Sequence, residues 1–265
     1  MQDRYVGDIG DFGKFALLRH LFAGAQWRPG IVWYRVEGEP GGNDPSCGCP
    51  KGGDGRFTDY LKEPGKYREF APEVFDELHR VVCVEKCRAI RCLDLPKLLG
   101  RPVIAYDRVV PSPASAVRSA EARKQAESER NRWLDDAVQA TNDSNAVFLD
   151  PDNGLSPKSV RLYSPRACKY VFDNEVREFA EGRVCVVYHH LGRHGSHEEQ
   201  IRRCRERLTK ATERRQMLCL KFRRISCRAY FIVPPPGRHD ELSGRVDEFL
   251  HSGWSGCFER VEPQD

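Results

Sequence analysis

The apolar positions of the chain fall into short continuous runs that alternate with amphipathic segments. Strand-like runs lie at 30–36, 102–110, 145–150, 183–190, 217–224 and 227–233. Helical spacing of apolar residues occurs at 13–22, 72–82, 119–140, 196–216 and 240–254. Several strands are apolar on both faces, which is typical of a mainly parallel sheet covered by helices on two sides. The pattern predicts an α/β fold, a three-layer α/β/α arrangement whose last strands are candidates for antiparallel pairing.

The predicted strands at 145–150 and 183–190 both end at polar side chains. Asp150, Asp152 and Asn153 follow the first, where Pro151 stops the strand, and His189 and His190 end the second. Because parallel strands carry their ligands at their carboxyl ends, we expect these five residues to form a catalytic site. His189 and His190 must point to opposite sides of an extended chain, so only one can face a ligand. A plain strand-ending turn and surface histidines are the alternative interpretation.

Length and composition favour one α/β domain over residues 1–265, with a Gly/Pro-rich loop insert at about 37–66. Hydrophobic residues make up 40% of the chain and the net charge is only +4, which argues against disorder. We expect a cytoplasmic protein, since neither a membrane span nor a signal peptide is recognisable. The eleven cysteines are expected to be mostly reduced thiols, and their spacings match no common metal site. No metal or cofactor is predicted.

A basic segment at 198–224 holds ten Lys and Arg against four Glu, which favours double-stranded DNA as a partner over a solvated helix face. Ser196 and Glu199 resemble a capping box that starts this helix. The glycines at 7, 10 and 13 do not have dinucleotide-loop spacing, and they indicate either a frayed terminus or a loop that closes over the site. The predicted DNA contacts are Lys14, Arg193, His194, Arg202, Arg203 and Arg205, and the predicted base contacts are Phe12, Trp33, Tyr34, Asn43 and Asp44.

Four functions fit this set of residues. Asp150 and Asp152 could hold the metal of a nuclease. The segment LDPDNG (149–154) resembles the Asp-Pro-Pro-Tyr loop of S-adenosylmethionine-dependent DNA amino-methyltransferases. Those enzymes also have a glycine-rich loop after their first strand and an acid after their second, and FAGAQ (22–26) is the nearest candidate for the loop. A base-excising enzyme needs a carboxylate, a donor to the departing base and a stacking ring, but no metal. A non-catalytic DNA-binding module is the fourth possibility.

Three segments resemble a bacterial family of anti-phage DNA glycosylases, which is itself similar to the uracil-DNA glycosylase superfamily. They are RYVGDIGDFGKFALLR (4–19), FLDPDNGL (148–155) and YHHLGRHGSHEEQI (188–201). The resemblance implies base flipping and hydrolysis of the N-glycosidic bond of a modified cytosine, such as a glucosylated hydroxymethylcytosine in phage DNA, to give abasic sites. Asp150 would be the carboxylate, Asn153 the base reader, and His189 or His190 the donor. Two departures weaken the match: the acidic loop lies past the middle of the chain, and the late loop lacks the His-Pro-Ser pattern.

Overall fold

A seven-stranded sheet forms the centre of the protein, for which a computed structural model describes residues 1–36, 57–113 and 115–263. The strand order is β2-β1-β3-β6-β8-β7-β9. β1, β2, β3 and β6 are parallel, whereas β8 runs antiparallel between β6 and β7, and β9 is antiparallel to β7. The strands are β1 Pro29–Trp33, β2 Ile104–Tyr106, β3 Ala146–Asp150, β6 Val184–His190, β7 Leu218–Phe222, β8 Arg228–Val233 and β9 Phe258–Arg260. A separate pair joins β4 Gly154–Leu155 to β5 Tyr170–Val171.

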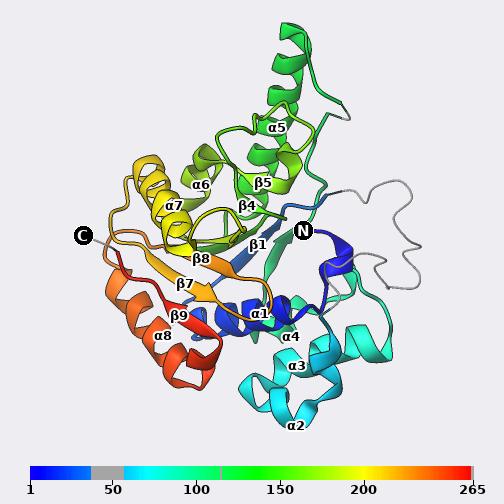
Figure 1. Ribbon diagram of the computed structural model, residues 1–265, viewed down its shortest axis with the longest axis vertical. Helices are drawn as coiled ribbons and strands as arrows, with labels where there is room; N and C mark the ends of the chain where they lie inside the picture. Colours follow the sequence, from blue (N-terminus) through cyan, green and yellow to red (C-terminus); the bar gives the residue numbers. More distant parts are fainter. Residues whose placement is uncertain (37–56, 114, 264–265) are drawn as a thin grey trace.

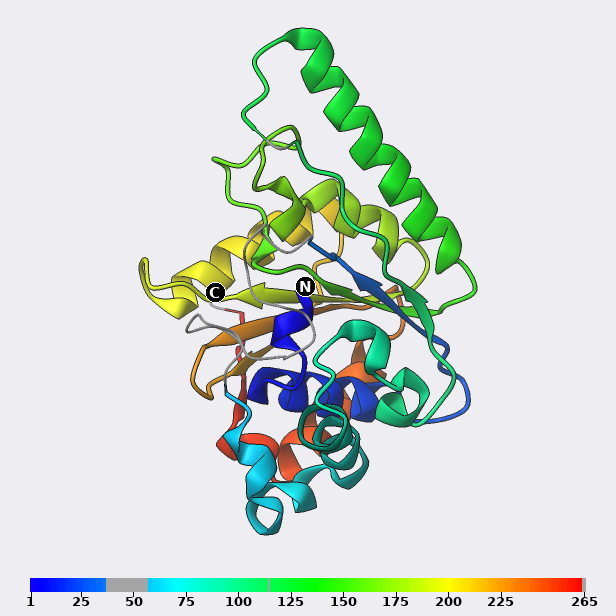
Figure 2. The same ribbon diagram turned by 90° about the vertical axis from the view of Figure 1, so that its right-hand side faces the viewer.

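Helices cover both faces of the sheet, as Figure 2 shows with the sheet nearly edge-on. On one face lie α1 Ile9–Leu21, α3 Pro72–His79, α4 Leu95–Leu99 and α8 His239–His251, and on the other α5 Ala120–Ala140, α6 Asp173–Ala180 and α7 His197–Thr212. The shorter elements are α2 Pro64–Tyr67, the 3-10 helices Asp3–Tyr5, Asp59–Lys62, Arg68–Phe70, Ile90–Cys92, Ala167–Lys169 and Trp254–Gly256, and a π-helix at Arg80–Val84. Figure 1 shows α5 extending beyond the rest of the molecule.

Alternate residues of the central strands enter two different apolar clusters. Ile31 and Phe148 pack on the side of α1 and α8, while their neighbours Val32 and Leu149 pack on the side of α5 and α6. This alternation explains why the strands are apolar on both faces. The predicted three-layer α/β/α fold and its antiparallel late strands are therefore confirmed.

Three details differ from the sequence predictions. The strand predicted at 102–110 is regular only over Ile104–Tyr106. The predicted loop insert at about 37–66 becomes helical from Asp59 onwards, and its residues 37–56 lie outside the described part of the chain. A disulfide joins Cys87 to Cys92, while the other seven cysteines in the described ranges are free thiols. No helix among the described residues is both long and apolar enough to cross a membrane.

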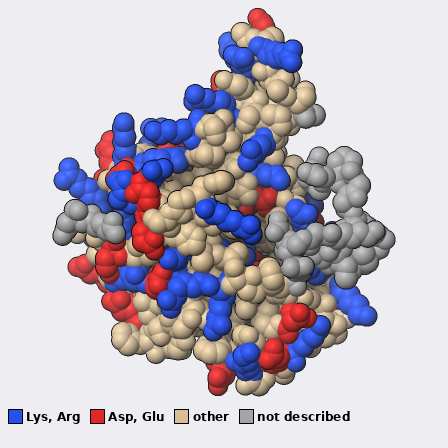
Figure 3. All heavy atoms as spheres, in the orientation of Figure 1, with Lys and Arg blue, Asp and Glu red and all other residues tan. Residues whose placement is uncertain are grey.

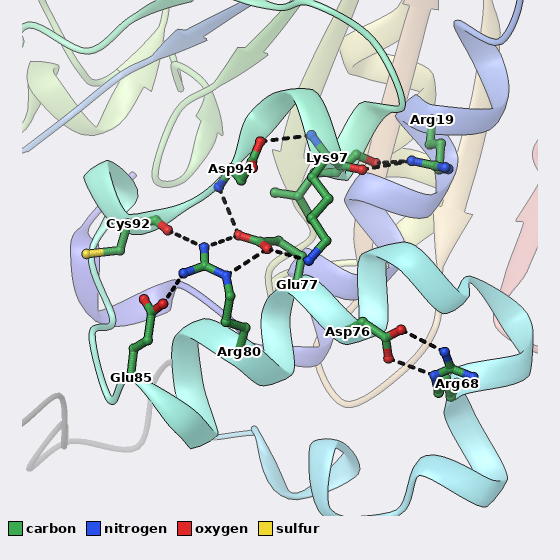
Figure 4. A network of polar contacts seen from close by, with 10 residues as sticks. Arg19, Arg68, Asp76, Glu77, Arg80, Glu85, Cys92, Asp94 and Lys97 are labelled. Carbon is green, nitrogen blue, oxygen red and sulfur yellow. Dashed lines mark hydrogen bonds and ion pairs between the residues drawn. The ribbon is translucent and has the colours of Figure 1, made fainter.

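A charged network joins α3 to α4 beneath α1 (Figure 4). Glu77 is completely buried and accepts hydrogen bonds from Arg80 Nε at 2.9 Å and from the backbone N–H of Asp94 at 2.9 Å. Lys97 Nζ lies 3.4 Å from the same carboxylate. Arg19 of α1 donates to the Lys97 carbonyl at 2.9 Å. The network fixes the helical layer on which α1 rests.

We predict that Glu77→Gln lowers the free energy of unfolding by about 2 kcal/mol, because the buried carboxylate that pairs with Arg80 and Lys97 is replaced by an amide whose N–H donor faces those cations. Asp76→Asn is the matched control, since Asp76 is half exposed and its pair with Arg68 is worth less than about 1 kcal/mol. Urea titrations of both variants measure the difference. Equal losses would show that the Glu77 network does not hold the two helices together.

Candidate functional site

A cavity of ≈190 Å³ opens where α1 meets the carboxyl ends of β3 and β6. β2 and β3 lie on opposite sides of β1, so the chain changes its winding direction beside this cavity. Such a topological switch point is where open α/β sheets bind ligands. The lining residues are Met1, Tyr5, Asp8, Gly10, Asp11, Lys14, Phe57, Asp150, Pro151, Asp152, Asn153, Tyr188, His190, Ser226, Arg228 and Tyr230.

A buried ion triad forms the back of the cavity. Lys14 Nζ lies 2.7 Å from Asp11 Oδ1 and 2.9 Å from Asp150 Oδ2, and the Lys14 side chain is only 3% exposed. Burial alone would lower the pKa of Lys14, but the two carboxylates outweigh it and raise the pKa to about 12. The predicted contact of Lys14 with a DNA phosphate is therefore wrong, because the ammonium is engaged inside the protein.

The N-terminal glycines allow α1 to approach the sheet closely. A Cβ atom on Gly10 would lie 1.1 Å from Nη1 of Arg228, and one on Gly13 would lie 2.8 Å from the Phe222 ring. Asp8 caps the helix by accepting from the Gly10 N–H at 2.9 Å, and it also binds Arg228 at 3.1 Å. The segment is neither frayed nor a mobile loop over the site. Its glycines are packing positions.

The two histidines point to opposite sides of β6, as their alternation predicts. His189 Nδ1 accepts a hydrogen bond from the Leu155 N–H at 3.0 Å, and its Nε2 lies 3.5 Å from Cys204 Sγ. Burial lowers the pKa of His189 to about 3, with smaller effects from His190 and Arg207. His189 is thus a neutral residue packed against β4 and is not catalytic. His190, in contrast, lines the cavity.

The residues of the Asp150 loop share the cavity but have different partners. Asp152 accepts a hydrogen bond from Gln2 Nε2 at 2.5 Å and lies 3.6 Å from the Met1 amino group. That amino group also donates to the carbonyl of Tyr34 at 2.5 Å. The Asn153 N–H donates to the carbonyl of Lys169 at 2.8 Å. No group of three or more His, Cys, Asp or Glu residues suited to a metal ion occurs in the described ranges.

The predicted stacking rings lie in the core. Phe12, Trp33 and Tyr34 are each at most 2% exposed, and none lines the cavity. Phe12 packs on Tyr60 and Trp254, and the Tyr34 hydroxyl donates to Glu175 at 3.2 Å. The assignment of these three rings to base stacking is therefore wrong. Asn43 and Asp44, the other predicted base contacts, lie outside the described residues.

Four aromatic residues line the cavity, Tyr5, Phe57, Tyr188 and Tyr230, and sequence analysis selected none of them. Tyr188 of β6 and Tyr230 of β8 are directly paired on the two neighbouring antiparallel strands, and their ring centroids lie 6.0 Å apart. Burial raises the pKa of Tyr188 to about 12 and that of Tyr230 well above its ordinary value. Tyr188 directly precedes His189 and His190 at the end of a predicted strand, and this position could have indicated that it belongs to the site.

Much of the predicted basic stripe on α7 is paired within the protein. Arg202 and Arg203 both bind Glu199, and Arg205 donates to the Val261 carbonyl at 2.6 Å. Arg193 and His194 are exposed in the loop before α7. Figure 3 shows Lys and Arg spread over the face that it displays, with Asp and Glu mainly towards its left and lower margins. DNA contact through these residues stays a prediction.

Comparisons with known proteins give little. No family model matches the chain, and no curated protein matches it. Among solved structures, the chain is similar to protein LPL1258 of Legionella pneumophila, described by the family model DUF519. The match covers 96% of both chains with 12% identity and a TM-score of 0.41. A likeness this weak supports no inference.

We predict that His189 makes the protein less stable below pH 6.5. Below this pH the histidine is protonated in the unfolded chain but stays neutral in the native protein, because its native pKa is about 3. The free energy of unfolding therefore falls by roughly 1.4 kcal/mol per pH unit. His189→Asn keeps an acceptor for Leu155 and should lose less stability between pH 7 and pH 5. Urea unfolding at several pH values measures this, with exposed His251→Asn as the control. A wild-type slope in His189→Asn would contradict the assignment.

Proposed function

We propose that this protein transfers a methyl group from S-adenosylmethionine to an amino group of a nucleic-acid base. The supporting observation is the order in which residues follow the first three strands along the chain. The Asp150 loop ends β3, Asp107 directly follows β2, and a segment with Gly38, Gly41 and Gly42 in its sequence follows β1. This is the order of features that the amino-methyltransferase resemblance requires.

The strand positions change the assignment of the glycine-rich segment. FAGAQ (22–26) lies between α1 and β1, so it precedes the first strand and cannot be the cofactor loop. The glycines that do follow the first strand belong to residues 37–56, which are not described. Glycines therefore do follow the first strand in the sequence, as the proposed function requires, although they are not those of FAGAQ.

Asp107 suits the ribose of a nucleoside ligand. It is exposed at the carboxyl end of β2, and β2 pairs in parallel with β1, the strand at the switch point. An acid at the end of such a strand accepts hydrogen bonds from ribose hydroxyls in dinucleotide-binding sheets. The same chemistry applies to the adenosine of S-adenosylmethionine.

The charge of the cavity favours a cationic ligand over a phosphate. Its lining carries four carboxylates, Asp8, Asp11, Asp150 and Asp152, against the cationic side chains of Lys14 and Arg228 and the Met1 amino group. In a partly buried site an excess of carboxylates stabilises positive charge. The sulfonium of S-adenosylmethionine is such a charge, and its amino-acid end carries both signs.

The chain's own residues have to accept one proton and to hold the target base. S-adenosylmethionine supplies a methyl group on positively charged sulfur. Asp150, kept beside Lys14, can accept a hydrogen bond from the target amino group and take its proton as the nitrogen gains the methyl carbon. The carbon–sulfur bond would break in the same step, and neutral S-adenosylhomocysteine would leave. Asn153 stands where the resembling loop has tyrosine, so the ring beside the target would come from Tyr188, which is only partly buried at the cavity.

Excision of a modified cytosine is the second candidate function. Asp150, Asn153 and His190 line one cavity, which is the combination of carboxylate, amide and imidazole that the glycosylase resemblance implies. A carboxylate there could stabilise the cationic sugar formed when the bond to the base breaks. The two activities leave different products, so one incubation separates them.

We predict that the wild-type protein, incubated in EDTA with tritiated S-adenosylmethionine and either plain or modified phage DNA, puts tritium into DNA. Asp150→Asn should reduce transfer at least about 100-fold, as loss of a proton acceptor does. Exposed Asp135→Asn is the control and should keep full activity. Alkali-sensitive sites without tritium would instead support the glycosylase, and neither product would reject both.

We also predict that Asp107→Asn raises KM for S-adenosylmethionine about tenfold while kcat changes little, because charge-assisted bonds to the ribose are lost in binding. Initial rates at varied S-adenosylmethionine concentration measure the effect. A loss of kcat at unchanged KM would contradict a ribose contact. A base-excising enzyme would show no dependence on this residue.

A further inference from the structure

The turn between β7 and β8 carries an unusual residue, Ile225. Its φ is +62°, in the left-handed region that β-branched residues rarely adopt. Its side chain is 59% exposed, although it is large and apolar. Neither feature helps the protein to fold, since a glycine or asparagine would fit this backbone with less strain. Strain of this kind points to a functional role.

The turn is held firmly on both sides. The Arg223 N–H donates to the Cys257 carbonyl at 2.8 Å, and the Leu191 N–H donates to the Cys227 carbonyl at 3.0 Å. The Arg223 guanidinium donates to the Ser255 carbonyl at 3.0 Å. These bonds hold the two ends of the turn, at Arg223 and Cys227, to the neighbouring elements. Ile225 therefore projects from a turn that is anchored at both ends.

Ile225 also has a distinctive position. The next residue, Ser226, lines the cavity, as does Arg228 two residues further on. Arg223 and Arg224 precede Ile225 and are exposed, and Arg223 lies 3.1 Å from the Glu259 carboxylate. Nε of Arg224 lies 3.2 Å from Cys257 Sγ, which anchors that side chain beside the turn. The rim of the cavity thus combines one projecting apolar side chain with two adjacent cations.

We propose that Ile225 is a wedge that enters the base stack of duplex DNA when the target base moves into the cavity. Enzymes that modify a paired base must take it out of the helix, and an apolar side chain can fill the opened step. Arg224 would contact a phosphate beside it, and Arg223 would do so by exchanging its ion pair with Glu259 for a phosphate. The inference rests on the proposed function only for its nucleic-acid substrate. It adds which side chain would take the place of the target base in the duplex.

A protein partner fits these observations less well. Stable interfaces bury several hundred Å² of surface on each partner, around an apolar centre. The other large apolar side chains exposed among the described residues are Val84 and Val109, which lie on other elements. One isoleucine beside two arginines is too small for such a centre. It is the right size for one base step.

The test uses Ile225→Gly, Ile225→Leu and the control Val84→Ala, each as the full chain. A mixed-sequence DNA duplex carries 2-aminopurine opposite thymine, whose fluorescence rises when it leaves the stack. Ile225→Gly should melt at or above the wild-type temperature, because glycine relieves the strain. It should nevertheless lower the wild-type fluorescence rise at least about fivefold. Ile225→Leu and Val84→Ala should keep the rise.

The same variants are then compared on single-stranded DNA, where no wedge is needed. Ile225→Gly should bind the 2-aminopurine single strand as tightly as the wild type does. No fluorescence rise with wild-type protein, or an equal rise with Ile225→Gly, would overturn the wedge. Because the readout needs no methyl transfer, an Ile225-dependent rise without transferred tritium would uphold the wedge and reject only the proposed methyltransferase.

Discussion

The buried ammonium of Lys14 constrains the site more than any other group. A charge that is 3% exposed must have opposite charges within contact, because the protein interior cannot solvate it. Its partners are Asp11, one turn earlier on α1, and Asp150, at the end of β3. The helix must therefore cross the carboxyl ends of the strands in one register. Gly10 and Gly13 make that approach sterically possible.

This constraint links the fold to the proposed chemistry. Asp150 is held by an ion pair at the back of the cavity, so its carboxylate has a fixed direction before any ligand binds. A second pair, Asp8 with Arg228, fixes the start of β8 against the start of α1. Those two pairs make the rear of the site rigid. The turn that carries Ile225 projects from the same strand that Arg228 begins.

Local patterns predicted the fold well and the site only in part. Apolar runs located the strands, Pro151 marked the end of β3, and alternation separated His189 from His190. The roles of Lys14, Phe12 and Trp33 were wrong because they depend on pairings between distant parts of the chain; Lys14 meets a carboxylate 136 residues away. Periodicity carries no information on such pairings. The pairing of Arg202 and Arg203 on α7 is different, since Glu199 lies three and four residues before them and could have been recognised.

The two candidate activities make similar demands on the cavity, so the cavity alone separates them poorly. Both pass through positive charge near Asp150, on sulfur in one case and on a sugar in the other. They differ in what lies at the neighbouring strand ends. A base-excising enzyme has no need for an exposed acid after β2, whereas a nucleoside cosubstrate at the switch point does. Asp107 is thus the residue that favours the methyl-transfer proposal, although it does not line the cavity.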